Sequence, residues 1–290
     1  MIIAVEGING SGKSTLCRLL AERFSQSVGF SKTYFQGQEV RGVDGDRILM
    51  LHQPGVFSLI RSAVADIHDT RVTLPMFFAD RVAAYDIIVE WQKREAFPPL
   101  DGNGGFQVDA NPHGANPIII DRWHPTTFAY HLAHGGSVSD FFSALFYYDG
   151  AIHTKYGLNH ARIEPDVVIW LTVDEAVRQE RLYKRKRPAD DPMGERDKRS
   201  LDAAFAQRIN RGFETFFDSR EYFNSVMGNR QGRCAVVPIH DDGSESPVQI
   251  ADRAWSQILP RGVAVRLSPK RELLGVRFYS EPGSEGSVTG

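Results

Sequence analysis

One stretch near the N-terminus carries the clearest chemistry, because it fits the pattern G-x-x-x-x-G-K-[ST]. In such a loop, glycines let backbone N–H groups converge on phosphate oxygens without a Cβ in the way. Lys13 can reach the β- and γ-phosphates, and Ser14 can hold Mg²⁺. The pattern therefore predicts a nucleoside-triphosphate site. The residues expected to hold the triphosphate are Gly7, Asn9, Gly10, Ser11, Gly12, Lys13, Ser14 and Thr15.

The segments on either side of this loop favour a phosphate site over an ordinary glycine turn. Residues 2–5 form an apolar run of the size of a buried strand, and residues 15–24 have helical spacing. A strand, a glycine-rich loop and a helix in this order are the context that the phosphate site needs. The N-terminus of the helix would add its partial positive charge. One face of that helix carries Leu16, Leu19, Leu20 and Phe24.

A second candidate group follows another apolar run, residues 118–120. Asp121 ends this predicted strand, where it can hold Mg²⁺ or its water beside Ser14. Arg122 comes next and can clamp a phosphate with two parallel hydrogen bonds. The alternative is an Asp–Arg pair on the surface. We favour the site, because polar residues at the ends of parallel strands usually face the ligand crevice.

A third candidate pair is Phe77 and Arg81, which are four residues apart and so share one helical face. An aromatic ring beside a guanidinium suits a nucleobase, because the ring can stack on the base and the guanidinium can donate to a base carbonyl. Aromatic residues at helical spacing are also common in cores. We expect Phe78 to be such a core residue.

A run of basic side chains leads into residues 188–191 and is the fourth candidate. Such a run is often a solvated helix face. In a protein that must neutralise charge on a transferred phosphoryl group, it can instead form a lid that delivers arginine and excludes water. We favour a lid over residues 184–197. The basic residues are Arg181, Lys184, Arg185, Lys186 and Arg187.

The pattern of the whole chain predicts an α/β fold with a five-stranded parallel sheet and helices on both faces. The expected strands are residues 2–5, 31–35, 118–121, 165–171 and 233–239. Besides the first helix, helices are expected over residues 47–67 (interrupted at Pro54-Gly55), 74–91, 174–187, 197–223 and 247–259, with helical segments between 121 and about 148. Residues 36–46 are expected to be a loop. We expect one domain, residues 1–260, with a surface insertion at 98–117, and a partly disordered extension, residues 261–290.

Composition narrows the classes of protein that fit. A formal net charge of −2 argues against a general nucleic-acid binder. No apolar run reaches the length of a membrane span, and residue 1 leads straight into the first strand rather than into a signal peptide. The two cysteines make no disulfide framework, so a cytoplasmic setting is expected. His124, His131 and His134 flank the site, but we expect structural roles rather than metal ligation.

These groups, in this order, resemble the thymidylate kinase family over roughly residues 1–259. The resemblance implies a three-layer P-loop kinase fold and transfer of the γ-phosphoryl group of ATP, with Mg²⁺, to a deoxynucleoside monophosphate, usually dTMP. It also implies a homodimer. The segments that carry the resemblance are residues 6–15, 77–81, 121–123, 126–130 and 165–171.

The resemblance also implies roles for single residues. Phe77 would stack on the base and Arg81 would contact a base carbonyl. Arg122 would hold the acceptor phosphate, and Tyr130 would press on the deoxyribose. These expectations describe a second nucleotide site facing the triphosphate.

The phosphate loop contains no arginine, which is similar to the bacterial type of this family, in which the lid supplies that charge. Lys13 and Arg122, with Arg185 and Arg187 from the lid, are therefore the expected catalytic residues. Asn9 stands where many members have an acidic residue, and its amide can still bond the sugar 3′-hydroxyl. Thr127 stands where the family often has an amide that reads the pyrimidine edge, so Thr127 is an expected substrate contact.

Other functions fit part of these patterns. Residues 180–187 also look like the lid of deoxynucleoside kinases, and Glu39 could be the base that such an enzyme needs. Asp121-Arg122-Trp123 instead favours an acceptor that already carries a phosphate. A nucleotide-binding module without turnover is a second alternative. A kinase acting on bases within DNA has less support, because the chain is nearly neutral and lacks a broad basic stripe.

Overall fold

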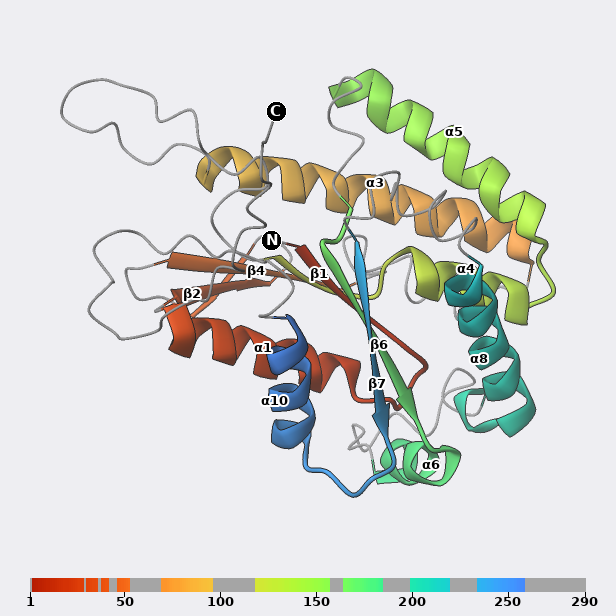
Figure 1. The fold of residues 1–290 in the computed structure, drawn as a ribbon. Coiled ribbons are helices and arrows are strands. Elements are labelled where there is room, and N and C mark those ends of the chain that lie inside the picture. The colour runs from red at the N-terminus through yellow and green to blue at the C-terminus, as the bar shows by residue number, and fades with distance from the viewer. Residues whose placement is uncertain are drawn as a thin grey trace, which may run out of the picture.

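The computed structural model describes residues 2–28, 30–35, 38–41, 46–52, 69–95, 118–156, 164–184, 199–219 and 234–258. Its centre is a seven-stranded sheet with the strand order β3-β2-β4-β5-β1-β6-β7 (Figure 1). The strands are β1 (Ile2–Glu6), β2 (Phe30–Phe35), β3 (Gln38–Arg41), β4 (Asp46–His52), β5 (Ile118–Asp121), β6 (Val167–Val173) and β7 (Ala235–Asp241).

Strand β1 lies between β5 and β6 and runs parallel to both. In the register of this sheet, Ala4 pairs with Ile120 on one side and with Val168 on the other. The carboxyl ends of β1 and β5 therefore meet at the same edge. This edge carries both the glycine-rich loop that follows β1 and the Asp-Arg pair at the end of β5.

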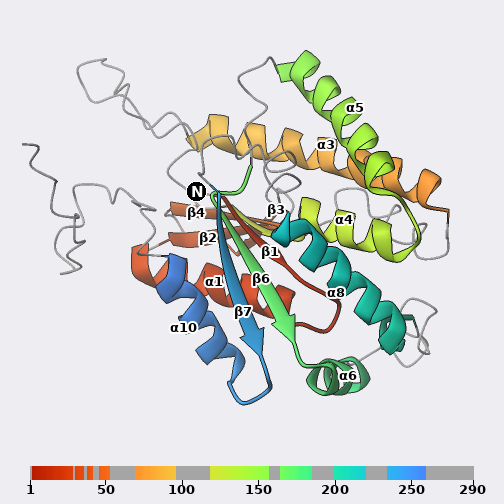
Figure 2. The same cartoon turned by 45° about the vertical axis from the view of Figure 1, so that its right-hand side comes forward.

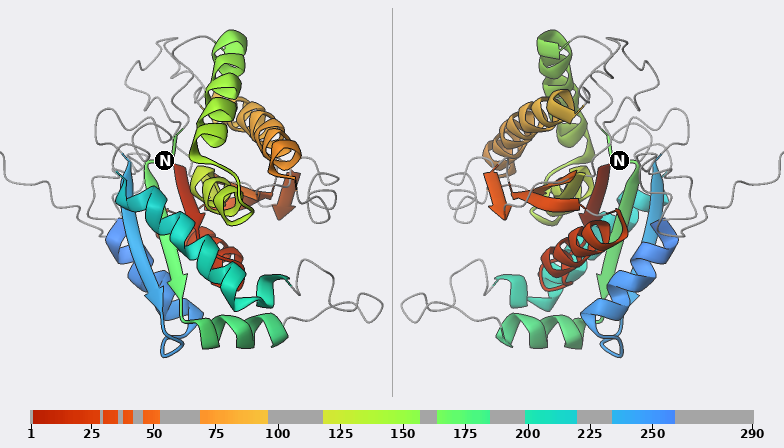
Figure 3. Two further views of the ribbon diagram at one scale, coloured as in Figure 1. Left: turned by 90° about the vertical axis from the view of Figure 1, so that its right-hand side faces the viewer. Right: turned by 90° about the vertical axis from the view of Figure 1, so that its left-hand side faces the viewer.

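Helices cover both faces of the sheet, as expected for a parallel sheet (Figures 2 and 3). Ile3 and Val5 of β1 pack into a core with α1 (Lys13–Val28) and α10 (Pro247–Ile258). Ile2 and Ala4 point the other way, into a core with α3 (Thr70–Glu95), α4 (His124–Ala133) and α5 (Val138–Tyr156). The sheet is therefore the middle of three layers, which confirms the expected architecture.

Helix α8 (Ala203–Asp218) packs on α4 and forms a smaller core with it. Its N-terminus is capped by Asp202, whose side chain accepts hydrogen bonds from the backbone N–H groups of Ala204 (2.8 Å) and Phe205 (3.2 Å). Helix α6 (Glu175–Lys184) follows β6 and lies at the edge of the sheet that carries the glycine-rich loop (Figure 1). None of the helices in the described ranges is long and apolar enough to span a membrane.

All five predicted strands are present, but the sheet is larger than predicted. The helix expected over residues 47–67 is wrong at its start, because β4 (Asp46–His52) is a strand inserted between β2 and β5. Leu49 and Leu51 of β4, two residues apart, both face the core with α3, which is the spacing of a strand. A short apolar run fits a strand or a helix equally well by sequence. Residues 53–67 lie outside the described part of the chain.

The loop expected over residues 36–46 is also corrected. It contains β3 (Gln38–Arg41), which pairs antiparallel with β2 at the edge of the sheet, whereas the other neighbouring strands are parallel. The predicted insertion (98–117), all but the first residue of the predicted lid, and the predicted extension (261–290) lie outside the described residues.

Candidate functional site

The glycine-rich loop joins β1 to the first turn of α1, as the motif predicts. Gly7, Gly10 and Gly12 have φ angles of +145°, +87° and +95°, a region that favours glycine. A Cβ on Gly7 would lie 2.3 Å from the carbonyl oxygen of Leu171, and a Cβ on Gly10 would lie 2.9 Å from Cγ of Arg178. Strand β6 and helix α6 therefore pack directly against the loop at Gly7 and Gly10.

A cavity of about 360 Å³ opens beside the loop. The volume lies within the range of small-ligand sites. Of the residues expected to hold the triphosphate, all but Gly7 line the cavity. The remaining lining residues are Leu16, Arg122, Leu171, Arg181, Asp241, Pro247 and Ile250.

Lys13 is buried at the start of α1 and folds back over the loop. Its Nζ donates to the carbonyl oxygen of Ile8 (2.6 Å) and lies 3.5 Å from Oγ of Ser11. Burial, with a smaller effect from nearby Arg122, lowers the pKa of Lys13 to about 7. A polyanion in the cavity would favour the charged ammonium, because an opposite charge stabilises the protonated form.

Ser14 and Asp121 are in contact at the carboxyl ends of the neighbouring strands β1 and β5. Oγ of Ser14 donates to Oδ2 of Asp121 at 2.6 Å. Within the described ranges, no group of three or more His, Cys, Asp or Glu side chains is arranged to hold a metal ion. Mg²⁺ needs no such group, because it usually takes one or two protein oxygens together with phosphates and waters. The Ser14 hydroxyl and the Asp121 carboxylate therefore fit Mg²⁺ beside a bound triphosphate.

Arg122 lies beside the phosphate loop in a strained conformation. Its φ angle is +79°, and its backbone N–H donates to the carbonyl oxygen of Val5 (3.0 Å). Nη2 donates to Oδ1 of Asn9, and the guanidinium lies 5.7 Å from the centre of the Tyr130 ring. Its Nε is buried without a hydrogen-bond partner among the described residues. The structure thus brings together Asn9, Arg122 and Tyr130, three of the residues that the family resemblance implies for the acceptor site.

Glu6 is a residue whose role sequence reasoning missed. It is fully buried, and its carboxylate accepts from the backbone N–H of Trp123, the backbone N–H of Thr126 (3.0 Å) and the Thr126 hydroxyl. Burial raises the pKa of Glu6 to about 7, although these hydrogen bonds oppose the rise. The side chain fixes the turn that carries Arg122. The role of Glu6 could have been suspected from the sequence, because Glu6 is a carboxylate at the end of an apolar strand.

Arg81 of α3 lies close to the turn that carries Arg122, because it contacts Trp123 and Thr127. Only 3% of its surface is exposed, Nη2 donates to Oγ1 of Thr127 (2.9 Å), and the guanidinium lies 4.7 Å from the centre of the Trp123 ring. Arg81 and Thr127 are therefore neighbours, as expected. Phe77 is half-buried on α3, and Phe78 is a core residue, as predicted, which stacks on Tyr148 at 5.3 Å.

A buried polar cluster behind Arg81 was not predicted. Glu164 accepts from Nε1 of Trp123 (3.1 Å) and from the hydroxyl of Tyr85 (3.3 Å), and it lies 3.7 Å from Nε2 of His124. Burial raises the pKa of Glu164 to about 8. Burial and the charge of Arg81 hold the pKa of His124 well below its usual value. Because Nη1 of Arg81 contacts Nδ1 of His124, that nitrogen accepts and Nε2 carries the proton.

His124 therefore has a structural role, as expected from the sequence. His131 has one as well, because its Nε2 lies 3.0 Å from the carbonyl oxygen of Ser137, to which it can donate. His134 is exposed, and its ring lies 4.9 Å from the ring of Phe205.

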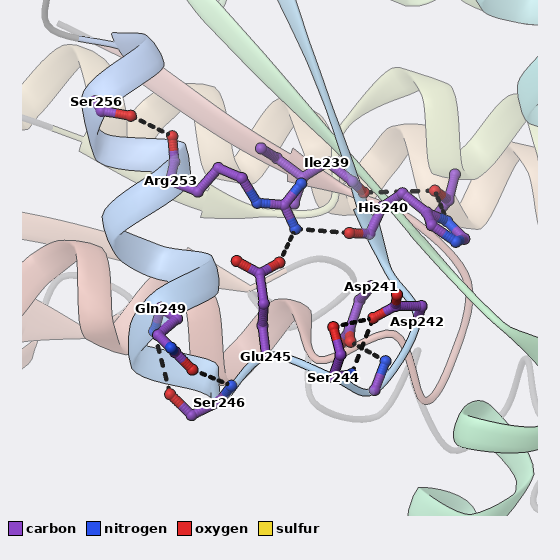
Figure 4. A network of polar contacts seen from close by, with 12 residues as sticks. Ile239, His240, Asp241, Asp242, Ser244, Glu245, Ser246, Gln249, Arg253 and Ser256 are labelled. Carbon is purple, nitrogen blue, oxygen red and sulfur yellow. Dashed lines mark hydrogen bonds and ion pairs between the residues drawn. The ribbon is translucent and has the colours of Figure 1, made fainter.

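The far wall of the cavity is built from α6 and from the loop between β7 and α10. Arg181 pairs with the buried carboxylate of Asp241 at 2.6 Å, and the backbone N–H of Gly243 donates to the other oxygen of Asp241 (2.9 Å). Arg253 of α10 donates to the carbonyl oxygen of His240 (2.6 Å) and to Glu245, which holds this loop in place (Figure 4). Arg185 and Arg187, the lid residues predicted to be catalytic, lie outside the described residues.

The fold and the site together define a P-loop nucleotide kinase fold. A parallel sheet between two helical layers carries a phosphate-binding loop at its carboxyl edge, with a lysine, a serine–carboxylate pair and a second cation around it. No protein-family model matches the chain.

Comparisons with individual proteins find two curated relatives and a solved structure. The thymidylate kinase of Cereibacter sphaeroides is 24% identical over 265 residues, which cover 89% of this chain and 94% of the relative. The thymidylate kinase of Afipia carboxidovorans is 25% identical over 267 residues, covering 89% of each chain. A solved structure of thymidylate kinase from Candida albicans matches 89% of this chain and 90% of its own, with 17% identity and a TM-score of 0.47.

The chain is thus similar to thymidylate kinases over most of its length.

Proposed function

We propose that this protein transfers the γ-phosphoryl group of ATP to dTMP or a related pyrimidine deoxynucleoside monophosphate, giving ADP and the deoxynucleoside diphosphate. The observation that supports this best is the position of Arg122. It lines the same cavity as Lys13, where a second cation can hold the phosphate of an acceptor nucleotide.

The ATP phosphates would lie on the loop, with backbone N–H groups and Lys13 as donors and the N-terminus of α1 directed at them. Ser14 and Asp121 would hold Mg²⁺. When bound, Mg²⁺ would neutralise charge on the β- and γ-phosphate oxygens. Arg181 and the loop that begins at Asp241 would border the rest of the donor nucleotide.

The acceptor would occupy the region in front of Arg122. We propose that Tyr130 packs against the deoxyribose, that Phe77 stacks on the base, and that Arg81 and Thr127 contact the polar edge of the base. The neighbouring positions of Arg81 and Thr127 support this arrangement. Asn9 would bond the 3′-hydroxyl of the sugar.

The chemistry needs little proton transfer, because the attacking oxygen of a monophosphate is already ionised at neutral pH. That oxygen forms a bond to the γ-phosphorus while the bond from this phosphorus to the β–γ bridging oxygen breaks, and ADP leaves. The protein's contribution is to hold two polyanions in line and to neutralise the charge that develops. Lys13 and Arg122, with Arg185 and Arg187, would do this.

A coupled assay of ADP release tests the proposal, with dTMP, dUMP, dCMP, dGMP and the corresponding free deoxynucleosides as acceptors. We expect dTMP or another pyrimidine monophosphate to give the highest kcat/KM. Higher turnover of a free nucleoside would instead identify a deoxynucleoside kinase. Binding of ATP with no turnover of any acceptor would favour a nucleotide-binding module. Light scattering would test the homodimer that the family resemblance implies.

A further inference from the structure

We propose that Arg178 and Ser200 are positioning residues of this enzyme, which hold the phosphate loop from behind and orient the side chain of Asn9 toward Arg122. The inference deepens the proposed function and rests on it for the identity of the two nucleotides. Neither residue lines the cavity. Both would act through residues that do.

Arg178 joins three separate segments of the chain. It lies on α6 with 1% of its surface exposed, and its Nε and Nη2 donate to the two carboxylate oxygens of Glu175, each at 2.6 Å. Its Nη1 donates to the backbone carbonyl oxygen of Ser200 and lies 3.5 Å from the carbonyl oxygen of Asn9. A buried guanidinium is stable only when its donors are paired, so these contacts fix the segments relative to one another.

The phosphate loop rests directly on this side chain. The hypothetical Cβ of Gly10 comes within 2.9 Å of Cγ of Arg178 and within 3.1 Å of Cγ of Leu182, so the loop and α6 have no space between them. A change in the volume or direction of the Arg178 side chain therefore changes where the N–H groups of the loop point. Those groups are the expected donors to the ATP phosphates.

Ser200 anchors the side chain of Asn9 next to Arg122. Nδ2 of Asn9 donates to Oγ of Ser200 at 3.0 Å, and Oδ1 of Asn9 accepts from Nη2 of Arg122. A flipped amide would place its NH₂ group against the guanidinium, where both groups are donors. The Arg122 guanidinium therefore sets the orientation of the amide, and the Ser200 hydroxyl holds the Asn9 side chain within reach of Arg122.

These contacts form one continuous chain from α6 to the acceptor site. It runs from Arg178 through Ser200 and Asn9 to Arg122, so it joins the loop that would hold the donor to the arginine that would hold the acceptor phosphate. Arg122 has a strained backbone and an Nε without a partner among the described residues. Its contacts with Asn9 and with the Tyr130 ring therefore determine where the guanidinium points.

The test measures binding and turnover in R178M, R178K, S200A, N9A and the double variant N9A/S200A. Titration calorimetry gives the Kd for ATP and for dTMP, and the ADP-release assay gives kcat and KM. R71M and S139A are matched controls, because Arg71 pairs with Asp69 and Ser139 lies on α5, both on exposed surfaces outside the cavity. Melting temperatures separate loss of fold from loss of positioning.

We expect R178M to weaken ATP binding by about tenfold, and R178K by less, while R71M leaves it unchanged. S200A should weaken dTMP binding by about threefold and leave the Kd for ATP unchanged, which is the size of one lost hydrogen bond. In the N9A background, S200A should have no further effect on dTMP binding, because Ser200 affects the acceptor site only through its hydrogen bond to Asn9.

A Kd for ATP in R178M within twofold of the wild type, with only a lower melting temperature, would overturn the role of Arg178. An undiminished effect of S200A on dTMP binding in the N9A background would overturn the role of Ser200. If the wild type bound ATP and phosphorylated no monophosphate, the proposed function would fail. The Kd for ATP in R178M would still test whether Arg178 positions the phosphate loop.

Discussion

The hydroxyl of Ser14 donates to a carboxylate oxygen of Asp121 at 2.6 Å, although the two residues are 107 positions apart in the sequence. The parallel pairing of β1 with β5 makes this contact possible, because Asp121 is the last residue of β5 and Ser14 follows the loop that leaves the carboxyl end of β1. The pair places a carboxylate next to the hydroxyl of Ser14, which lines the phosphate cavity.

We therefore predict that D121N and S14A raise the Mg²⁺ concentration needed for half-maximal activity, each by about tenfold or more, because each removes or weakens one oxygen ligand. Titration of Mg²⁺ at saturating ATP and acceptor gives this value. S139A is the control for S14A. An unchanged Mg²⁺ requirement in D121N would contradict the assignment of the metal site to this pair.

Lys13 should make ATP binding depend on pH. Its pKa is lowered to about 7 in the free protein, mainly by burial. Bound phosphates would favour the ammonium form and raise this pKa, so binding takes up a proton and ATP affinity falls as the pH rises from about 7 to 8.5. Calorimetry in buffers of different ionisation enthalpy measures the proton uptake.

K13M should lose this proton uptake and lower kcat by about a hundredfold or more, because a main cation at the transferred phosphate is gone. ATP itself titrates near neutral pH, so the informative quantity is the difference between the wild type and K13M. Equal proton uptake in the two proteins would show that Lys13 does not contact the phosphates.

Arg122 should matter for an acceptor that carries a phosphate. R122M removes the guanidinium, and we expect kcat/KM for dTMP to fall by about a thousandfold, as for other arginines that neutralise transferred phosphoryl groups. Binding of thymidine, which has no phosphate, should change by less than about threefold. Equal losses for dTMP and thymidine would mean that Arg122 acts on something other than the acceptor phosphate.

Arg81 and Thr127 should influence which base is accepted. T127A removes the hydroxyl that accepts from Nη2 of Arg81, and we expect α4 to stay folded because alanine is a strong helix former. We expect the ratio of kcat/KM between dTMP and dCMP to change by about three- to tenfold, because one hydrogen bond that directs the guanidinium is lost. T172A, at a hydroxyl bonded to β7, is the control. An unchanged ratio would separate this pair from base selection.

Glu164 should make stability depend on pH. Burial raises its pKa in the folded protein to about 8 from an ordinary value of 4.5, so the folded state binds the proton more tightly than the unfolded state. Stability from this group is therefore fully present below pH 4.5 and is lost as the pH rises toward 8, with a slope of at most about 1.4 kcal/mol per pH unit.

E164Q cannot titrate, so its unfolding free energy should vary less between pH 5.5 and 8 than that of the wild type. Denaturant unfolding at several pH values measures the difference. E180Q, on the exposed surface of α6, is the control. Parallel pH profiles for the wild type and E164Q would show that this carboxyl group has an ordinary pKa.

The sequence alone determined the parts of this protein that depend on neighbouring residues. The phosphate loop could be predicted because its glycines, Lys13 and Ser14 act through local backbone geometry and lie between a strand and a helix. The positions of Asp121 and Arg122 at the end of an apolar strand placed them at the same edge of the sheet. The α/β class followed from the alternation of apolar runs with helical spacing.

Only the tertiary structure decided the rest, because those features depend on which distant segments meet. Whether residues 46–52 form a strand or a helix was settled by the gap between β2 and β5 that they fill. No local pattern indicates that Glu164 lies behind His124, or that Arg178 supports Gly10. Each of these side chains acquires its role from burial against partners elsewhere in the chain, and burial is a property of the folded protein.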